Sequence, residues 1–184
     1  MEKKRCKWAS DVPEIYVKYH DEEWGVPCHD DHHLFEMLIL EGFQAGLSWL
    51  TILKKRAFRE AFDHFDATII KDYDEDKIKT LMQNKAIVRN KRKIEAAKIN
   101  ANVFIQIQKE FGSFDAYLWH FTDNKVVYDH DEPIPTSTPL SDEISNDLKK
   151  RGMKFVGTTI IYAYLQAIGV VNSHEKDCFL YQKH

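Results

Sequence analysis

The chain has 184 residues, 43% of them apolar, and a net charge of −3. This length and composition fit one domain, residues 1–184, and exclude a membrane-spanning chain, because no apolar run approaches the ~20 residues of a membrane helix. Three widely spaced cysteines argue against a disulfide framework, and no apolar segment follows the basic N-terminus as in a signal peptide. We therefore expect a cytoplasmic protein that meets no membrane. The absence of a coiled-coil stripe favours a monomer.

Helical periodicity dominates the first two thirds of the chain. Residues 31–42 carry apolar side chains three and four positions apart, with Asp31 as the predicted N-cap. The same spacing predicts further helices, in chain order, over residues 47–62, 66–70, 74–82, 90–111 and 114–121.

The last third opens with a segment, residues 122–140, that contains three of the five prolines and is predicted to be an ordered loop. Only 125–128 within it alternates like a strand. Ser141 is the expected N-cap of a helix that Gly152 closes, and residues 157–168 form a final buried helix. The chain is thus predicted to be all-α, with its N-terminal segment packed against the last helix.

Basic residues are clustered although the chain as a whole is acidic. One cluster comprises Lys85, Arg89, Lys91, Arg92, Lys93 and Lys98, a second comprises Lys54, Lys55, Arg56 and Arg59, and a third comprises Lys149, Lys150, Arg151 and Lys154. Each could be a solvated helix face. Since the acidic residues gather elsewhere, we expect instead a local positive surface that can meet phosphate.

Four possible metal ligands are divided between the two ends of the chain: Cys6, His20, His174 and Cys178. His174 and Cys178 are four residues apart and would share one face of a helical turn. Two thiolates and two imidazoles suit a closed tetrahedral zinc site, which would join the termini and leave no position for catalysis. The alternatives are a free buried cysteine with surface histidines, or a metal at the second polar cluster, His29, Asp30, Asp31, His32 and His33.

Aromatic residues surround a single carboxylate in the N-terminal part of the sequence: Trp8, Tyr16, Tyr19, Trp24 and Trp49. The carboxylate is Glu41, at the end of an apolar helix, where the macrodipole disfavours a negative charge. It could simply face solvent, and the aromatics could be core. Together, however, such rings and a carboxylate suit a flat cationic ring, by stacking, cation–π attraction and hydrogen bonds to ring N–H groups.

Several stretches, in order over essentially the whole chain, carry a resemblance to a known family. They are residues 5–8 (RCKW), 19–27 (YHDEEWGVP), 34–37 (LFEM), 40–49 (LEGFQAGLSW), 134–138 (IPTST), 149–152 (KKRG) and 154–159 (KFVGTT), with His174 and Cys178. On these residues the chain resembles the bacterial 3-methyladenine DNA glycosylase I family.

The resemblance implies an all-α helix-hairpin-helix glycosylase that removes 3-methyladenine from alkylated double-stranded DNA in the bacterial nucleoid, releasing the base as product. It implies a structural Zn²⁺ on Cys6, His20, His174 and Cys178. The base pocket corresponds to Trp8, Tyr16, Tyr19, Glu41 and Trp49, with Trp24 in or behind its wall. Gln44, Gly46 and Leu47 match the segment that fills the gap left by the extruded nucleotide, and the hairpin, residues 84–93, would meet phosphate through Lys85, Arg89, Lys91 and Arg92.

Two departures from the family pattern are expected to alter the DNA contacts. Phe43 stands where a polar residue is expected, and the hairpin contains no glycine for a tight turn. Two other functions remain open on the residues alone. A zinc-stapled DNA-binding module without activity would use the aromatics as core and have no base-sized pocket. A zinc hydrolase would hold its metal in the cluster at residues 29–33.

Overall fold

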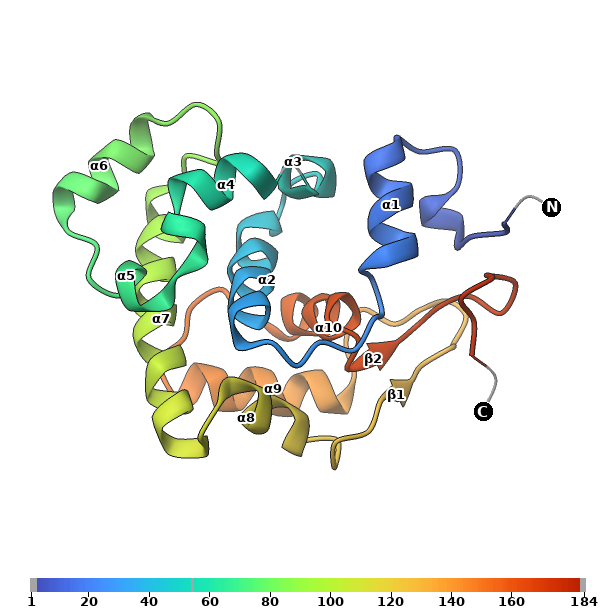
Figure 1. The fold of residues 1–184 in the computed structure, drawn as a ribbon. Coiled ribbons are helices and arrows are strands. Elements are labelled where there is room, and N and C mark those ends of the chain that lie inside the picture. The colour runs from blue at the N-terminus through green and yellow to red at the C-terminus, as the bar shows by residue number, and fades with distance from the viewer. Residues whose placement is uncertain (1–2, 54, 183–184) are drawn as a thin grey trace.

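The computed structural model describes residues 3–53 and 55–182, with the side chains of Thr51, Lys55 and Arg56 left outside the description. Helices dominate this part of the chain (Figure 1). Their bounds are η1 Lys7–Ala9, α1 Glu14–Glu22, α2 Asp31–Gln44, α3 Trp49–Leu53, α4 Lys55–Ala61, η2 Asp63–Phe65, α5 Ala67–Ile70, α6 Glu75–Gln83, α7 Lys91–Phe111, α8 Phe114–His120, α9 Pro139–Lys150 and α10 Thr158–Ala167.

Helix α2 forms the centre of the core and packs against α3, α7, α8 and α10 (Figure 1). Every residue from 34 to 43 is buried, including the carboxylates Glu36 and Glu41. A helix that is apolar on all sides is stable only inside a protein, and α2 therefore brings its C-terminal turn into the middle of the molecule. None of the helices in the described ranges is both long and apolar enough to cross a bilayer.

Two predicted N-caps are wrong by one and three residues. Asp30, not Asp31, caps α2 by accepting from the His33 amide, because the Asp31 carboxylate accepts the amides of Phe114 and Asp115 at the start of α8. Helix α9 begins at Pro139 with Thr138 as its N-cap, and Ser141 is the reciprocal partner of a capping box. The predicted helix over 47–62 starts only at Trp49, and α1 was not predicted.

A short sheet corrects the expectation of a purely helical chain. Strand β1, Val127–Tyr128, within the segment suspected of being a strand, pairs in parallel with β2, Val171–Asn172. Residues 25–28 meet the end of α10, where the Gly25 amide donates to the Gln166 carbonyl at 3.0 Å. Gly169 is required there, since its φ is +73° and a Cβ would lie 2.3 Å from the Val26 carbonyl carbon. The two ends of the chain therefore lie on the same side of the molecule (Figure 1).

Candidate functional site

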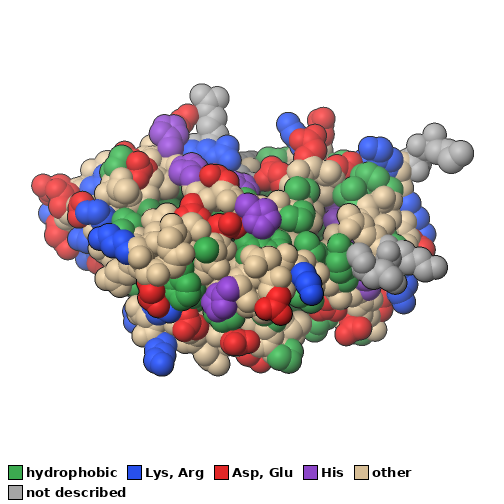
Figure 2. Space-filling model, turned by 60° about the horizontal axis from the view of Figure 1, so that its bottom comes forward, with side chains coloured by type: hydrophobic (Ala, Val, Ile, Leu, Met, Phe, Trp, Pro, Cys, Tyr) green, Lys and Arg blue, Asp and Glu red, His purple; other side chains and the backbone are tan. Residues whose placement is uncertain are grey.

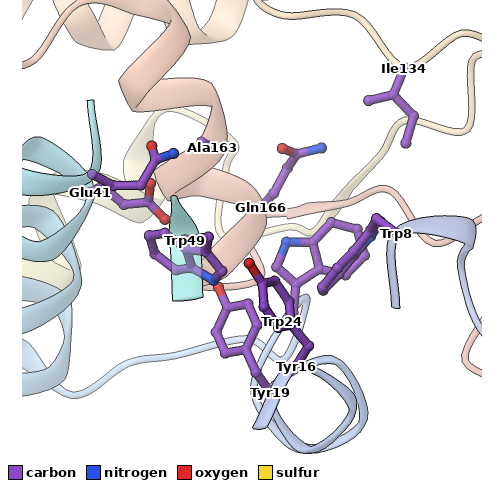
Figure 3. Close-up of a pocket in the computed structure, with 10 residues that line it drawn as sticks. Trp8, Tyr16, Tyr19, Trp24, Glu41, Trp49, Ile134, Ala163 and Gln166 are labelled. Carbon is purple, nitrogen blue, oxygen red and sulfur yellow. The ribbon is translucent and has the colours of Figure 1, made fainter. Parts of the chain in front are cut away.

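A pocket of about 410 Å³ opens between the N-terminal helices and α10 (Figure 3). Its volume is within the range of small-molecule sites. All six residues predicted for the base site line it. The complete lining is Trp8, Tyr16, Tyr19, Trp24, Glu41, Gln44, Trp49, Ile134, Ala163 and Gln166. The pocket contradicts the hypothesis of a non-catalytic module, which required the aromatics to leave no base-sized space.

Glu41 lies in the last turn of α2, is 4% exposed and lines the pocket. The alternative in which its side chain faces solvent is therefore wrong. Burial raises the pKa of the Tyr19 hydroxyl well above its usual value, and the charge of Glu41 raises it further. Tyr19 consequently stays protonated as a hydrogen-bond donor, beside a carboxylate that water does not screen.

The aromatic wall is assembled from separate elements. The rings of Tyr19 and Trp49 are 5.6 Å apart, and those of Trp8 and Trp24 are 5.1 Å apart in an edge-to-face arrangement. Trp24 is 8% exposed, so it lies in the wall and supports the more exposed rings. Such a surface favours a flat ring placed between two aromatic faces.

Besides Gln44, which was predicted to fill the DNA gap, three lining residues were not predicted as part of the pocket: Ile134, Ala163 and Gln166. Ile134 comes from the loop before α9, and the other two lie on α10. A signal did exist for Gln166, because it is a polar side chain near the end of an otherwise apolar helix. Figure 3 shows Gln166 among the side chains that line the pocket.

The four predicted metal ligands converge in the described structure, although 168 positions separate Cys6 from His174. All four are buried, and their ligand atoms lie within 4.8 Å of one another. The Sγ of Cys6 is 3.6 Å from Nδ1 of His174, and the Sγ of Cys178 is 3.5 Å from Nε2 of His20. In a tetrahedron with bonds of about 2.0–2.3 Å, neighbouring ligand atoms lie about 3.3–3.8 Å apart, so this donor set fits a metal ion.

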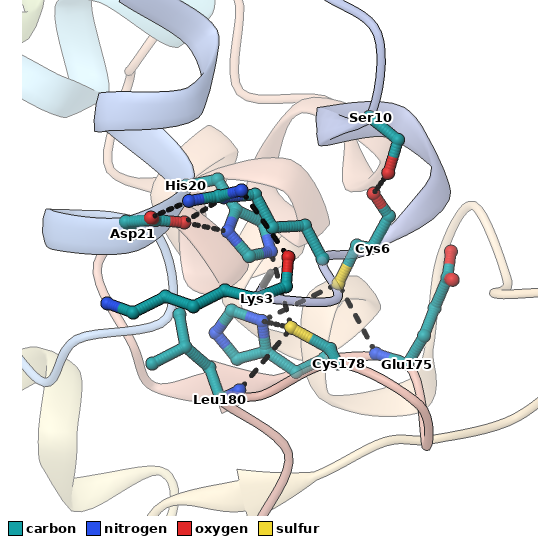
Figure 4. A network of polar contacts seen from close by, with 10 residues as sticks. Lys3, Cys6, Ser10, His20, Asp21, Glu175, Cys178 and Leu180 are labelled. Carbon is teal, nitrogen blue, oxygen red and sulfur yellow. Dashed lines mark hydrogen bonds and ion pairs between the residues drawn. The ribbon is translucent and has the colours of Figure 1, made fainter. Parts of the chain in front are cut away.

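Groups around the four ligands fix their orientation (Figure 4). Asp21 lies 2.9 Å from Nδ1 of His20 and pairs with Arg5, whose hydrogen bonds lower the pKa of Asp21 to about 2. Burial raises the pKa of the Cys6 thiol to about 12 and lowers that of His174 to about 4. A bound cation would stabilise the thiolates and so offset the effect of burial on Cys6. The lowered pKa of His174 already favours the neutral imidazole that a metal requires.

The other proposed metal cluster is dispersed. His29 pairs with Asp115 at 2.7 Å, and Nε2 of His32 lies 2.6 Å from the carbonyl oxygen of His64. Asp30 caps α2, and Asp31 accepts the amides of Phe114 and Asp115 at the start of α8. In residues 3–53 and 55–182, the sole group of three or more such ligands is the one at the termini. The zinc hydrolase hypothesis therefore has no structural basis.

Residues 44–47 (the wedge) are the segment predicted to fill the gap that the extruded nucleotide leaves in the DNA. It forms a tight turn after α2 in which the Leu47 amide donates to the Gln44 carbonyl at 2.7 Å and Nε2 of Gln44 donates to the Leu47 carbonyl at 3.1 Å. Gly46 has a φ of +80°, and the Leu47 side chain is 39% exposed. Phe43 is buried against Phe58 instead, so the unexpected residue affects core packing and does not project with the wedge.

The hairpin at residues 84–93 turns without glycine because two asparagine side chains accept hydrogen bonds from backbone amides within it. Oδ1 of Asn84 accepts from the Ala86 amide at 2.9 Å, and Oδ1 of Asn90 accepts from the Lys93 amide at 3.2 Å to cap α7. Such Asx contacts mimic a backbone turn. The basic side chains predicted to meet phosphate, Lys85, Arg89, Lys91 and Arg92, are all exposed.

The remaining basic residues differ in their surroundings. Lys54 lies outside the described residues, and Arg59 donates to Glu36 at 2.8 Å. Arg151 pairs with Asp147 and Glu110, whereas Lys149, Lys150 and Lys154 are exposed. On the face shown in Figure 2, acidic, basic and histidine side chains are interspersed, so this face offers no continuous basic surface.

Known proteins that resemble this chain are enzymes or structures named for a methylated base. Residues 8–181 match the model of the methyladenine glycosylase family. DNA-3-methyladenine glycosylase 1 from Escherichia coli (strain K12) is 44% identical over 181 residues, with 96% of each chain covered. A crystal structure of 3-methyladenine DNA glycosylase I has a TM-score of 0.92 at 45% identity, covering 97% of this chain and 100% of that chain.

A second solved structure contains the base itself. It is a variant of 3-methyladenine DNA glycosylase I in complex with 3-methyladenine, with a TM-score of 0.91 at 35% identity and 98% of both chains covered. These matches extend over nearly the whole sequence, including every residue of the aromatic pocket. The chain therefore belongs to the methyladenine glycosylase family.

Proposed function

We propose that this protein excises 3-methyladenine from alkylated double-stranded DNA by hydrolysing the N-glycosidic bond. The observation that carries the proposal is the buried carboxylate of Glu41 in an aromatic pocket of a chain that belongs to this family. An enzyme can act on a base in this pocket only after the nucleotide has been extruded from the duplex.

The chemistry required of the protein is modest. N3-methylation places a positive charge on the attached base, so cleavage of the bond between the sugar C1′ and N9 returns an electron pair to the ring and releases neutral 3-methyladenine. Water then adds to the sugar cation and loses a proton. Since the leaving group needs no proton, no general acid is required, and the protein must chiefly select and hold the cationic base.

The carboxylate of Glu41 and the aromatic rings of the pocket select the methylated base over adenine. Glu41 accepts hydrogen bonds from the base edge, Trp49 and Tyr16 stack on its faces, and Tyr19 adds a polar contact. Trp8 and Trp24 complete the wall. A neutral adenine gains less from this pocket than a cationic purine, and selectivity is that difference.

The DNA is held by two neighbouring elements. The wedge, through Gln44, Gly46 and Leu47, fills the space of the extruded nucleotide. The exposed side chains of Lys85, Arg89, Lys91 and Arg92 contact phosphates, supported by the amides of the hairpin. We propose that the protein acts as a monomer.

The buried ligand group at the termini is proposed to hold one structural Zn²⁺. Its four donors, Cys6, His20, His174 and Cys178, are two sulfurs and two imidazoles, the set that zinc prefers in closed sites. When bound, the ion would fix the N-terminal segment that carries Trp8 against the C-terminus. The residues leave no open coordination position, so the site is structural.

The test is to incubate the protein with DNA methylated by dimethyl sulfate and to identify the bases released by chromatography. We expect 3-methyladenine in the supernatant and an abasic site in the DNA, with unmethylated adenine retained. Release of no base, by a protein that is folded and contains its metal, would refute the proposal.

A further inference from the structure

Lys93 is the single lysine or arginine among the buried polar residues of the described ranges, with 8% of its surface exposed. Buried lysines are rare because the ammonium loses its hydration, and burial accordingly lowers the pKa of Lys93. Lys93 also lies in the first turn of α7, where the helix dipole disfavours a positive charge. The lost hydration and the unfavourable helix dipole both destabilise the ammonium of Lys93, so a contact with another part of the chain is expected to compensate for them.

The compensating contact is with the C-terminal end of α2. Nζ of Lys93 donates to the carbonyl of Phe43 at 2.8 Å and to the carbonyl of Ala45 at 2.8 Å. Carbonyls at a helix C-terminus lack intrahelical partners and carry the negative end of the dipole, so a cation is favoured here. Lys93 thus joins the start of α7, where the hairpin ends, to the helix that carries Glu41.

The two accepting carbonyls lie on either side of Gln44, the first residue of the wedge. The wedge has only two hydrogen bonds of its own among those described, both between Gln44 and Leu47. Gln44 also lines the base pocket. The ammonium of Lys93 therefore holds the base of the wedge at two points, directly beside the pocket.

We propose that Lys93 is a positioning residue that couples the hairpin to the wedge, so that the Leu47 side chain is held ready to replace an extruded nucleotide. The proposal rests on the proposed function, since it assigns the wedge to DNA. It differs from a purely structural role in one respect: loss of the ammonium should impair nucleotide extrusion from a duplex while the base pocket itself still binds.

Lys98 provides a matched control. It lies on the same helix, is partly buried, and its Nζ donates to a backbone carbonyl, that of Tyr73, at 2.7 Å. That carbonyl lies between α5 and α6, away from the wedge. Lys98→Met therefore removes a comparable lysine–carbonyl contact without touching the coupling.

The experiment compares Lys93→Met, Lys98→Met and the wild type in three measurements. The first is release of 3-methyladenine from one methylated oligonucleotide, either single-stranded or annealed to its complement. The second is binding of free 3-methyladenine, followed by tryptophan fluorescence. The third is the fluorescence of 2-aminopurine placed beside the target nucleotide in a duplex, which rises when that nucleotide leaves the stack and no longer quenches it.

For Lys93→Met we expect kcat/KM on the duplex to fall by about tenfold or more, as for loss of a charged hydrogen bond. The decrease on the single strand should be under about threefold, affinity for the free base should be unchanged, and the 2-aminopurine signal should fall. Lys98→Met should keep the wild-type ratio of kcat/KM between duplex and single strand, the wild-type affinity for the free base and the wild-type 2-aminopurine signal. Equal losses on both DNA forms, or a normal 2-aminopurine signal, would overturn the proposal.

A variant that does not fold and a wild type without activity can each be told apart from failure of the coupling. If Lys93→Met does not fold, the same measurements on Lys93→Gln, which retains a donor amide but not the charge, decide the question. If the wild type releases no methylated base, the proposed function fails, whereas the 2-aminopurine measurement still tests Lys93 because it needs no catalysis.

Discussion

Replacing Glu41 by glutamine removes the charge from the pocket and keeps its shape. The side chain is 4% exposed, so water does little to screen its interaction with a bound cation. Hydrogen bonds to a charged group contribute about 1.5–3 kcal/mol, and neutral ones about 0.5–1.5 kcal/mol. Two bonds to the base edge therefore lose roughly 2–3 kcal/mol, and the lost attraction to the positive ring adds to this, for a total of about 2–4 kcal/mol.

At about 1.4 kcal/mol per factor of ten, Glu41→Gln should lower kcat/KM for release of 3-methyladenine by roughly 30- to 1000-fold. Binding of neutral adenine, measured by tryptophan fluorescence, should change by less than about tenfold. The assay is chromatography of bases released from methylated DNA under single-turnover conditions.

Glu36 offers a matched control, because it is also a buried carboxylate on α2 but pairs with Arg59 and does not line the pocket. Glu36→Gln should lower stability and leave the preference for 3-methyladenine over adenine intact. Unchanged excision by Glu41→Gln, or an equal loss of selectivity in both variants, would show that the charge of Glu41 does not discriminate between the bases.

Three further results are expected. Cys178→Ser, or chelation of the wild type, should lower zinc content, melting temperature and activity together, and loss of activity with an unchanged melting curve would contradict a structural metal. Trp49→Ala should weaken binding of free 3-methyladenine by about 5- to 100-fold, because stacking contributes roughly 1–3 kcal/mol per base; titration with unchanged affinity would remove Trp49 from the stack. Burial raises the pKa of Asp147, but hydrogen bonds from Tyr117 and Arg151 outweigh it and lower the pKa, so its stabilisation is present above about pH 4 and lost as pH falls through the folded pKa. Urea unfolding should accordingly show a larger penalty for Asp147→Asn at pH 7 than at pH 3, and equal penalties would contradict this assignment.

Local sequence patterns predicted most of the helices. They failed where a contact with a distant part of the chain decides the structure. The long helix α7 follows directly from the spacing of apolar residues over 90–111, and the structure adds Asn90 as its N-cap. At the start of α2, two adjacent aspartates were equally good caps, and Asp31 is excluded only because it accepts amides from α8, 83 and 84 residues away in the chain. Strand β1 lies in the segment that alternates like a strand, but no local pattern reveals that it pairs with β2 in a distant part of the chain.

The candidate site shows the same division. Ligand chemistry and the aromatic set could be proposed from the sequence, since residue types and their order are local information and the resemblance covers the whole chain. The Lys93 contact could not, because the sequence places that lysine in an apparently exposed basic cluster, and its burial became visible only with the fold.

The sequence by itself determined the residue types available for chemistry: four side chains of the kinds that ligate metals, five aromatics and one carboxylate, together with helical periodicity in most segments. Tertiary structure alone decided which face of each helix is turned inward, and therefore that Glu41 opens into a cavity, that Gln166 joins the pocket, and that the amino-terminal and carboxy-terminal ligands meet. The physical reason is that periodicity depends on neighbours along the chain, whereas burial and electrostatics depend on neighbours in space.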